Sequence, residues 1–170
     1  MLSVVQKEGE SSTTPALKMT TVRRATVEDL SSVVNLAHEM YLESTYQTVP
    51  FNRDEVAAFV FGLINNPKCL PLLCFHGSEA IGMLGLTANG FFFSPGTKVV
   101  TDFSLFVTKK HRGGLAAVRL IRAGSKWARE VGANYFILGA TALHDNSRVY
   151  QLYEALGFKE IGRVFSRRTL

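Results

Sequence analysis

The chain has 170 residues, a hydrophobic share of 46% and a formal net charge of +5. This length suits one domain around a single core, so no second domain is needed. No apolar run approaches the ~20 residues of a membrane span, and the N-terminus lacks the order of a signal peptide, which predicts a cytoplasmic protein without membrane partners. The two cysteines, Cys69 and Cys74, have no paired histidines nearby and make a poor zinc site, so we expect no metal.

The first third of the sequence divides into a tail and the start of a domain. Residues 1–19 are rich in Ser, Thr, Gly, Glu and Lys, which predicts a flexible tail ahead of a single domain over residues 20–170. A strand is predicted over residues 22–25, and a helix cap over residues 26–29. A second cap, Asn52 with Glu55, predicts another helix, which Pro67 ends. Both helices carry an apolar stripe, formed by Leu30, Val33, Val34, Ala37, Met40 and Tyr41 in the first and by Val56, Phe59, Val60, Leu63 and Ile64 in the second.

The remainder alternates between β-prone and helical segments. Apolar runs at 70–75, 80–87 and 99–107 predict strands, and residues 76–79 are typical of a hairpin connection. The segment 89–96 contains three phenylalanines, and we interpret it as a continued strand in preference to a mobile loop beside a substrate pocket. Further predicted elements are a helix ending near residue 131, a strand at 135–140, a short helix at 146–156 and a last strand at 158–165. This order predicts an α/β (α+β) fold with a mixed sheet.

Residues 107–117, with the sequence Val-Thr-Lys-Lys-His-Arg-Gly-Gly-Leu-Ala-Ala, lead from a strand through a glycine turn into a basic helix. A helix start offers backbone N–H groups without intrahelical partners, and the helix dipole adds positive charge there. Glycine lets the backbone turn sharply and approach a ligand closely. The segment is therefore typical of a phosphate-binding turn, although many strand-to-helix turns contain glycine for geometric reasons alone.

Downstream, Asn146 is followed seven residues later by Tyr153 and then by Leu-Gly-Phe at 156–158. Together with Arg112 and the glycine turn, this pattern resembles the GNAT superfamily of acyl-CoA-dependent N-acyltransferases. When Arg112 is aligned with the arginine of the family's pattern, Leu115 stands where the family usually has glycine, and Ala117 takes the last small position. A shift of one residue would restore Gly114 but would place His111 at the arginine position. The Arg-Gly-Gly-x-Ala loop is similar to phage and prophage-type members of the family.

The resemblance implies a GNAT-like fold, with a mostly antiparallel central sheet flanked by helices and a strand–helix–strand core that binds acyl-CoA. It also implies an N-acetyltransferase that moves an acetyl group from acetyl-CoA to a primary amine of a small molecule or protein. Attack would be direct, in a ternary complex. The basic residues near the turn would attract the phosphates of coenzyme A, although a solvated helix face explains most of these residues equally well.

Site residues follow from the resemblance position by position. It implies that the main chain of Phe106, Val107 and Thr108 binds the pantetheine arm and the thioester oxygen. It further implies that Asn146 contacts that arm and that Tyr153 is the general acid. The pyrophosphate would bind the N–H groups of Arg112, Gly113, Gly114, Leu115, Ala116 and Ala117. Without the resemblance, Tyr153 would be interpreted as a core residue and Asn146 as a helix N-cap.

The general base and the acceptor are left open by the residues themselves. Asp102 is the only carboxylate in its strand and would be costly to bury unpaired, whereas His144 can titrate near neutral pH. Loss of the amine proton to solvent is a third possibility. Aromatic residues at 46–51 and 91–95 predict a partly apolar acceptor pocket. Glu39, Glu43 and Asp54 of the first helices could attract a cationic amine into that region, but exposed helix carboxylates are common, so we interpret them as solvated.

Two other functions compete with the transferase. Leu115 in place of glycine leaves room for a non-catalytic acyl-CoA-binding or partner-binding module with the same fold. The net charge leaves room for a nucleic-acid binder, which ranks low because no recognised binding motif supports it. A monomer and a homodimer are both compatible with the sequence.

Overall fold

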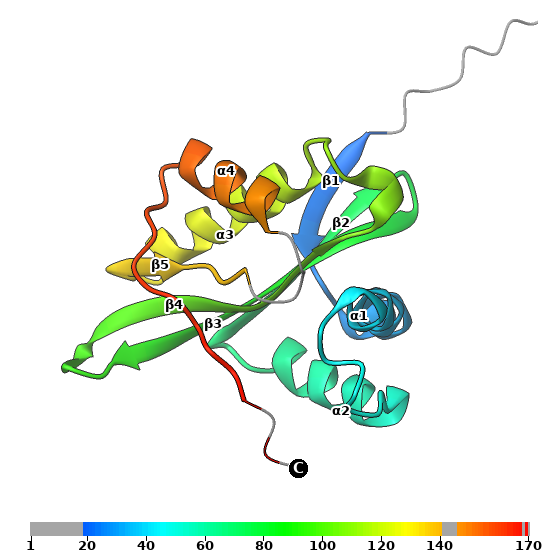
Figure 1. The fold of residues 1–170 in the computed structure, drawn as a ribbon, viewed down its shortest axis with the longest axis horizontal. Coiled ribbons are helices and arrows are strands. Elements are labelled where there is room, and N and C mark those ends of the chain that lie inside the picture. Colours follow the sequence, from blue (N-terminus) through cyan, green and yellow to red (C-terminus); the bar gives the residue numbers. More distant parts are fainter. Residues whose placement is uncertain (1–18, 141–145, 168, 170) are drawn as a thin grey trace, which may run out of the picture.

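The computed structural model describes residues 19–140, 146–167 and 169, and a five-stranded sheet forms its centre (Figure 1). The strands lie side by side in chain order: β1 (Thr20–Arg24), β2 (Cys69–His76), β3 (Glu79–Phe91), β4 (Ser94–Val107) and β5 (Tyr135–Ile137). The first four pair antiparallel, and β5 pairs parallel with β4. The prediction of a mixed, mostly antiparallel sheet is confirmed.

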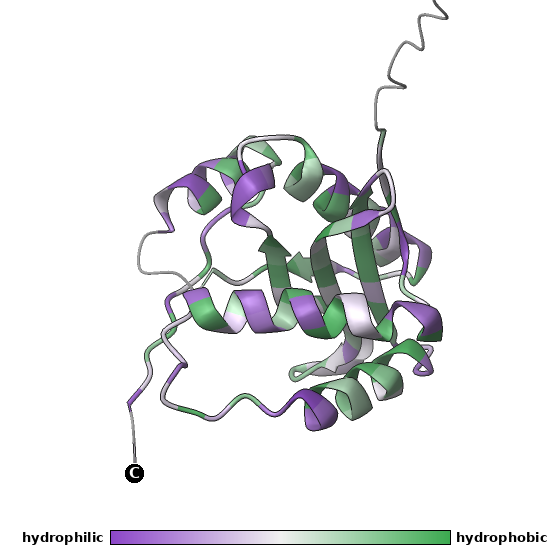
Figure 2. Ribbon diagram, turned by 90° about the vertical axis from the view of Figure 1, so that its right-hand side faces the viewer, coloured by the Kyte–Doolittle hydropathy of each residue, from purple (hydrophilic) through white to green (hydrophobic). Residues whose placement is uncertain are grey.

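Helices cover both faces of this sheet. On one face lie α1 (Leu30–Glu43) and α2 (Arg53–Ile64), and on the other lies α3 (Ala116–Glu130), with α4 (Ser147–Ala155) on the same side (Figure 1). Two short 3-10 helices, η1 (Val27–Asp29) and η2 (Lys109–His111), precede α1 and α3. Figure 2 shows the central strands as mostly hydrophobic between helices of mixed hydropathy. Each face of the sheet therefore buries its own cluster of apolar side chains.

Both predicted helix caps are present. The side-chain oxygen of Asn52 accepts hydrogen bonds from the N–H groups of Asp54 (3.0 Å) and Glu55 (3.3 Å), which starts α2. Thr26 and Asp29 form a capping box on η1, which runs directly into α1. Asp29 also binds Arg23 of β1 through two hydrogen bonds of 2.6 and 2.8 Å, and this holds the pKa of the Asp29 carboxyl far below its usual range. The cap thus ties α1 to the edge strand.

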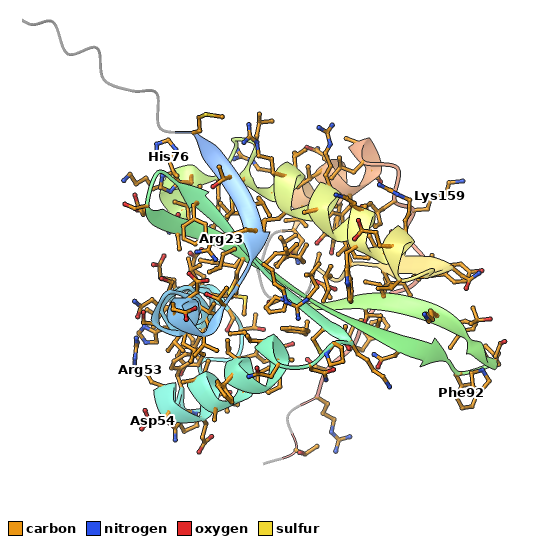
Figure 3. The ribbon with its side chains drawn as sticks, turned by 180° about the vertical axis from the view of Figure 1, so that it is seen from behind. Arg23, Arg53, Asp54, His76, Phe92 and Lys159 are labelled. Atoms are coloured by element: carbon orange, nitrogen blue, oxygen red, sulfur yellow. The ribbon has the colours of Figure 1, made fainter. Side chains whose placement is uncertain are left out.

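The segment 89–96 continues the sheet, as the strand interpretation predicted. β3 extends to Phe91 and β4 begins at Ser94, so the two strands form a long hairpin with Phe92 and Phe93 at its tip. Figure 3 shows Phe92 at the end of this hairpin, away from the helices. The three phenylalanines therefore contact one another rather than the cleft described below.

The predicted last strand at 158–165 is wrong. The structure assigns neither helix nor strand to any described residue after α4, and Ile161, Val164 and Phe165 are 78%, 80% and 89% exposed. Phe158, Ile161, Val164 and Phe165 are β-prone residues, but a strand also requires a partner, and no described segment pairs with this one. The other boundary changes are small: β5 ends at Ile137 rather than residue 140. No helix among the described residues is both long and apolar enough to cross a bilayer.

Candidate active site

A cleft of about 1150 Å³ lies between the two helical layers at the end of β4. Residues of α1 and α2 line one side, and the start of α3, Gly139 and α4 line the other. Thr108 and Ala116 are absent from the described lining, and His144 lies outside the described residues. The expected site residues that the cleft brings together are Asp102, Phe106, Val107, Arg112, Gly113, Gly114, Leu115, Ala117, Asn146 and Tyr153.

The cleft exists because β4 and β5 part early. They pair only over Val99–Thr101 and Tyr135–Ile137, so no described strand pairs with that edge of β4 farther along. On its other edge, the N–H of Thr108 donates to the Ile81 carbonyl at 2.9 Å. Backbone hydrogen bonds to a neighbouring strand alternate along an antiparallel ladder. The backbone N–H of Phe106 therefore faces β3, and the backbone N–H of Val107 faces the open edge. Of the three residues expected to bind the thioester arm, Val107 is the one whose N–H points into the cleft.

Asp102 and Tyr153 meet at one peptide segment. Oδ1 of Asp102 accepts a hydrogen bond from the Gly139 N–H at 2.7 Å, and the Tyr153 hydroxyl donates to the Gly139 carbonyl at 2.8 Å. Tyr153 is 8% exposed and its ring also contacts Phe158, at 5.8 Å between centroids. Tyr153 is therefore both a buried core residue and a residue that lines the cleft.

Burial raises the pKa of both side chains. It raises the pKa of Asp102 above its usual value, although the hydrogen bond from the Gly139 N–H acts in the opposite direction. Burial raises the pKa of Tyr153 as well, and the nearby charge of Asp102 adds to this effect. At neutral pH the Tyr153 hydroxyl is a protonated donor, and Asp102 is a carboxyl group with unusual affinity for a proton.

The turn between β4 and α3 has the geometry of an anion site. The chain passes through η2 before the glycines, rather than entering the helix directly, and Gly113 adopts a positive φ of 81° that other residues rarely adopt. In α3 the hydrogen bond from the Arg119 N–H to the Leu115 carbonyl, 2.9 Å long, completes the first turn. The N–H groups of Ala116 and Ala117 precede it, as at any helix start, and are free of the i to i−4 ladder.

The Arg112 side chain fixes this turn to two other parts of the fold. Its Nε donates to the Val107 carbonyl at 2.9 Å, and its two terminal nitrogens bind the carboxylate of Glu43 at 2.8 and 2.9 Å. The guanidinium also lies 5.4 Å from the centroid of the Phe106 ring. Arg112 therefore joins the end of α1 to the end of β4, and Glu43 is a paired residue rather than a solvated one.

Two residues at the start of α4 and just before it also line the cleft. Asn146 precedes α4 at the N-cap position, and its amide donates to the Ala140 carbonyl at 2.9 Å. Arg148, in the first turn of α4, also lines the cleft. Its positive charge, together with that of Arg112, which Glu43 partly balances, suits a phosphorylated ligand. Among the described residues, no three His, Cys, Asp or Glu side chains gather as a metal site would require.

The match to a family model decides what this architecture is. The Acetyltransferase (GNAT) family model matches residues 32–158, which includes the cleft, the turn and α4. The chain belongs to the acetyltransferase (GNAT) family. As a GNAT protein it is an acetyl-CoA-dependent acyltransferase, and the family resemblance seen in the sequence is confirmed. No curated relative matches the chain by sequence.

Solved structures agree on the fold. A transcriptional regulator from Bacillus halodurans has a TM-score of 0.74 at 19% identity, covering 88% of this chain and 99% of the other. The aminoglycoside N-acetyltransferase AAC(6')-Iy in complex with CoA has the same TM-score and identity, covering 92% and 99%. A Trypanosoma brucei acetyltransferase has a TM-score of 0.69 at 21% identity, covering 88% and 99%. At these identities the likeness concerns the fold of the GNAT protein, not its substrate.

Sequence reasoning missed two residues that line this cleft, Arg148 and Phe103, and it missed the pairing of Glu43 with Arg112. Arg148 carries no motif signal, since one arginine in a short helix is ordinary. Glu43 meets Arg112 across 69 sequence positions, a separation that no local pattern reveals. Phe103 follows Asp102 in the same strand, and only the sheet register shows where its ring lies.

Proposed function

We propose that residues 20–170 form a single GNAT domain that transfers the acetyl group of acetyl-CoA to a primary amine by direct attack in a ternary complex. The observation that carries the proposal is the meeting of Asp102 and Tyr153 at Gly139, inside a cleft that also contains the start of α3. Tyr153 as an acid, Asp102 as a base and an anion site at the start of α3 would then surround the same cleft.

The coenzyme is expected to lie along the α3 and α4 side. Its pyrophosphate would accept hydrogen bonds from the main chain between Gly113 and Ala117, near Arg148 and Arg112. The N–H of Val107 would donate to the pantetheine arm or to the thioester oxygen as that oxygen gains negative charge. This arrangement orients the thioester carbon toward Asp102.

In the reaction, the amine nitrogen forms a bond to the thioester carbon and the carbon–sulfur bond breaks. Asp102, directly or through water, takes the proton that converts the bound ammonium ion to the neutral nucleophile, for which its raised pKa suits it, and the proton that the nitrogen loses after attack passes to solvent. The sulfur leaves as a thiolate. The Tyr153 hydroxyl leaves the Gly139 carbonyl and donates a hydrogen bond to this sulfur. Its raised pKa makes Tyr153 a weak acid, so it stabilises the thiolate mainly as a hydrogen-bond donor. Solvent then restores any proton that is transferred.

The first experiment compares two tyrosines of α4. Tyr153→Phe is expected to lower kcat for acetyl transfer by about 100-fold, the usual scale of one proton-transfer group, while acetyl-CoA still raises Tm. Tyr150→Phe is the matched control, because Tyr150 is 53% exposed and is absent from the described cleft lining. Free-thiol release and melting temperature are measured for both.

Each result has a distinct meaning. Unchanged turnover in Tyr153→Phe would remove the acid role but leave the transferase. Stabilisation by acetyl-CoA without thiol release against any amine would favour the non-catalytic binding module. No stabilisation at saturating acetyl-CoA, with AMP and ADP as comparison ligands, would contradict the coenzyme site itself.

A further inference from the structure

The side of the cleft opposite the α3 start is built from aromatic side chains. Tyr41 of α1 and Phe51 of the α1–α2 connection contact each other, with 5.2 Å between their ring centroids. Phe59 of α2 meets Phe103 of β4 edge to face at 6.2 Å. All four residues line the cleft. The α1–α2 side is therefore an aromatic wall, defined here as Tyr41, Phe51, Phe59 and Phe103.

A β-bulge places Phe103 in this wall. In the β3–β4 ladder Gly85 pairs with Ser104 and Leu86 pairs with Asp102, so Phe103 is the additional residue of β4. A bulge of this kind redirects side chains and often lies beside an active site. Phe103 lies across Gly85, where a Cβ atom would come within 2.1 Å of the ring. The absence of a side chain at Gly85 thus makes room for the ring one residue away from the reacting carboxyl.

The wall presents apolar surface that nothing in the described chain covers. Phe59 is 59% exposed and Phe103 is 42% exposed, although both are large apolar residues. A second hollow of about 560 Å³ continues from the wall toward the α1–α2 connection and is lined in part by Tyr41, Tyr46 and Phe59. Concave, exposed aromatic surface beside polar reacting groups is the usual character of a small-molecule site.

Charge restricts the ligand further. Asp102 is the single carboxylate among the described residues that line the cleft, and Glu55 is the single one along the second hollow. Glu43, nearby at the end of α1, is paired with Arg112 at both carboxylate oxygens. One ammonium group can be balanced at Asp102, but a ligand with several would leave most of them unpaired among aromatic rings.

We infer that the acceptor is a primary amine with one positive charge attached to an aromatic body. Its ring packs against the exposed surfaces of Phe59 and Phe103, and its nitrogen lies toward Asp102 and the thioester. This inference rests on the proposed transferase function and specifies the acceptor of the same cleft. It assigns substrate selection to the aromatic wall.

The test compares 2-phenylethylamine with ethylamine, which has the same amino group without the ring, and with kanamycin, which carries several. The expected kcat/KM for 2-phenylethylamine exceeds that for each of the others by about tenfold or more, since apolar pockets discriminate on this scale. Equal or higher kcat/KM with kanamycin would overturn the inference.

Substitutions in α2 and β3 test whether the aromatic wall is what selects the acceptor amine. Phe59→Ala is expected to lower the ratio of kcat/KM for 2-phenylethylamine to that for ethylamine by about tenfold. Phe61→Ala is the matched control, because Phe61 is a 50% exposed residue of the same helix that is absent from the described lining of both hollows. Gly85→Ala is a second test, since its Cβ displaces the Phe103 ring without changing Phe103. Equal effects of Phe59→Ala and Phe61→Ala would contradict the assignment.

Binding separates this inference from the transferase itself. Calorimetry measures 2-phenylethylamine against the protein saturated with CoA, where no reaction occurs. Ring-dependent binding without turnover would support the acceptor class and contradict the proposed transfer. Acetylation of kanamycin or ethylamine without binding of 2-phenylethylamine would support transfer and overturn the acceptor class.

Discussion

At the residue scale, the half-buried carboxyl of Asp102 places its proposed function and the stability of the fold in opposition. Its raised pKa means that the folded state prefers the protonated acid. The stability from this group is fully present below about pH 4, the pKa of an unfolded aspartate, and is lost as pH rises through the folded pKa. At neutral pH the protein therefore keeps a group that favours unfolding, and the proposed role of Asp102 as the base would be a reason to keep it.

Asp102→Asn tests this opposition. The amide oxygen introduced by the substitution can still accept the Gly139 N–H but the side chain never ionises, so the variant is expected to melt roughly 2–4 °C above the unaltered protein at pH 8 and to equal it near pH 4. Its kcat is expected to fall by about 100-fold. Melting curves from pH 4 to 8 and thiol-release assays measure the two effects. A variant less stable than the unaltered protein at pH 8 would contradict the account.

At the element scale, the Arg112–Glu43 ion pair joins α1 to the turn before α3. Both carboxylate oxygens are bound and the side chains are only 33% and 23% exposed, so the pair is expected to contribute more than an ordinary surface bridge. Glu43→Gln is expected to lower Tm by roughly 2–4 °C, about 1 kcal/mol for a domain of this size, and to raise the KM for acetyl-CoA.

The Lys126–Glu130 pair on α3 provides the comparison. Its two side chains are 74% and 56% exposed and 3.7 Å apart, so Glu130→Gln is expected to change Tm by less than about 1 °C. Thermal melts and acetyl-CoA titrations of the two variants measure the contrast. Equal changes would show that the Arg112 contacts do not organise the turn.

Elements differ in how far the sequence predicts them, for a physical reason. The Asn52 cap depends on residues three positions apart, so it could be predicted, as could the turn at Gly113. The lack of a strand at 158–165 could not be predicted, because β-prone residues say nothing about whether a partner strand is within reach. The residues around Asp102 depend on register: the bulge that positions Phe103 comes from the pairing of two strands.

At the scale of the whole molecule, the net charge of +5 is expected to act on the anionic coenzyme. Raising NaCl from 50 to 500 mM should weaken acetyl-CoA binding by about tenfold, because salt screens the attraction between its phosphates and the basic end of the cleft. Acetyl-pantetheine, which lacks the phosphates, is the control and should bind equally at both salt concentrations. Calorimetric titrations measure both ligands, and equal salt dependence would locate the attraction elsewhere.

The bulge in β4 also determines which parts of the cleft can change during evolution. Asp102, Phe103 and Val107 line the cleft from one stretch of strand, and in the proposed reaction they would provide the base, part of the acceptor wall and a contact to the coenzyme arm. An insertion or deletion there would move all three together, since side-chain direction alternates along a strand. Phe59 lies on a helix surface, where a substitution changes the shape of the wall and leaves the strand register untouched. New acceptors are therefore expected to arise through changes in α2, while the length of β4 stays the same over long periods of descent.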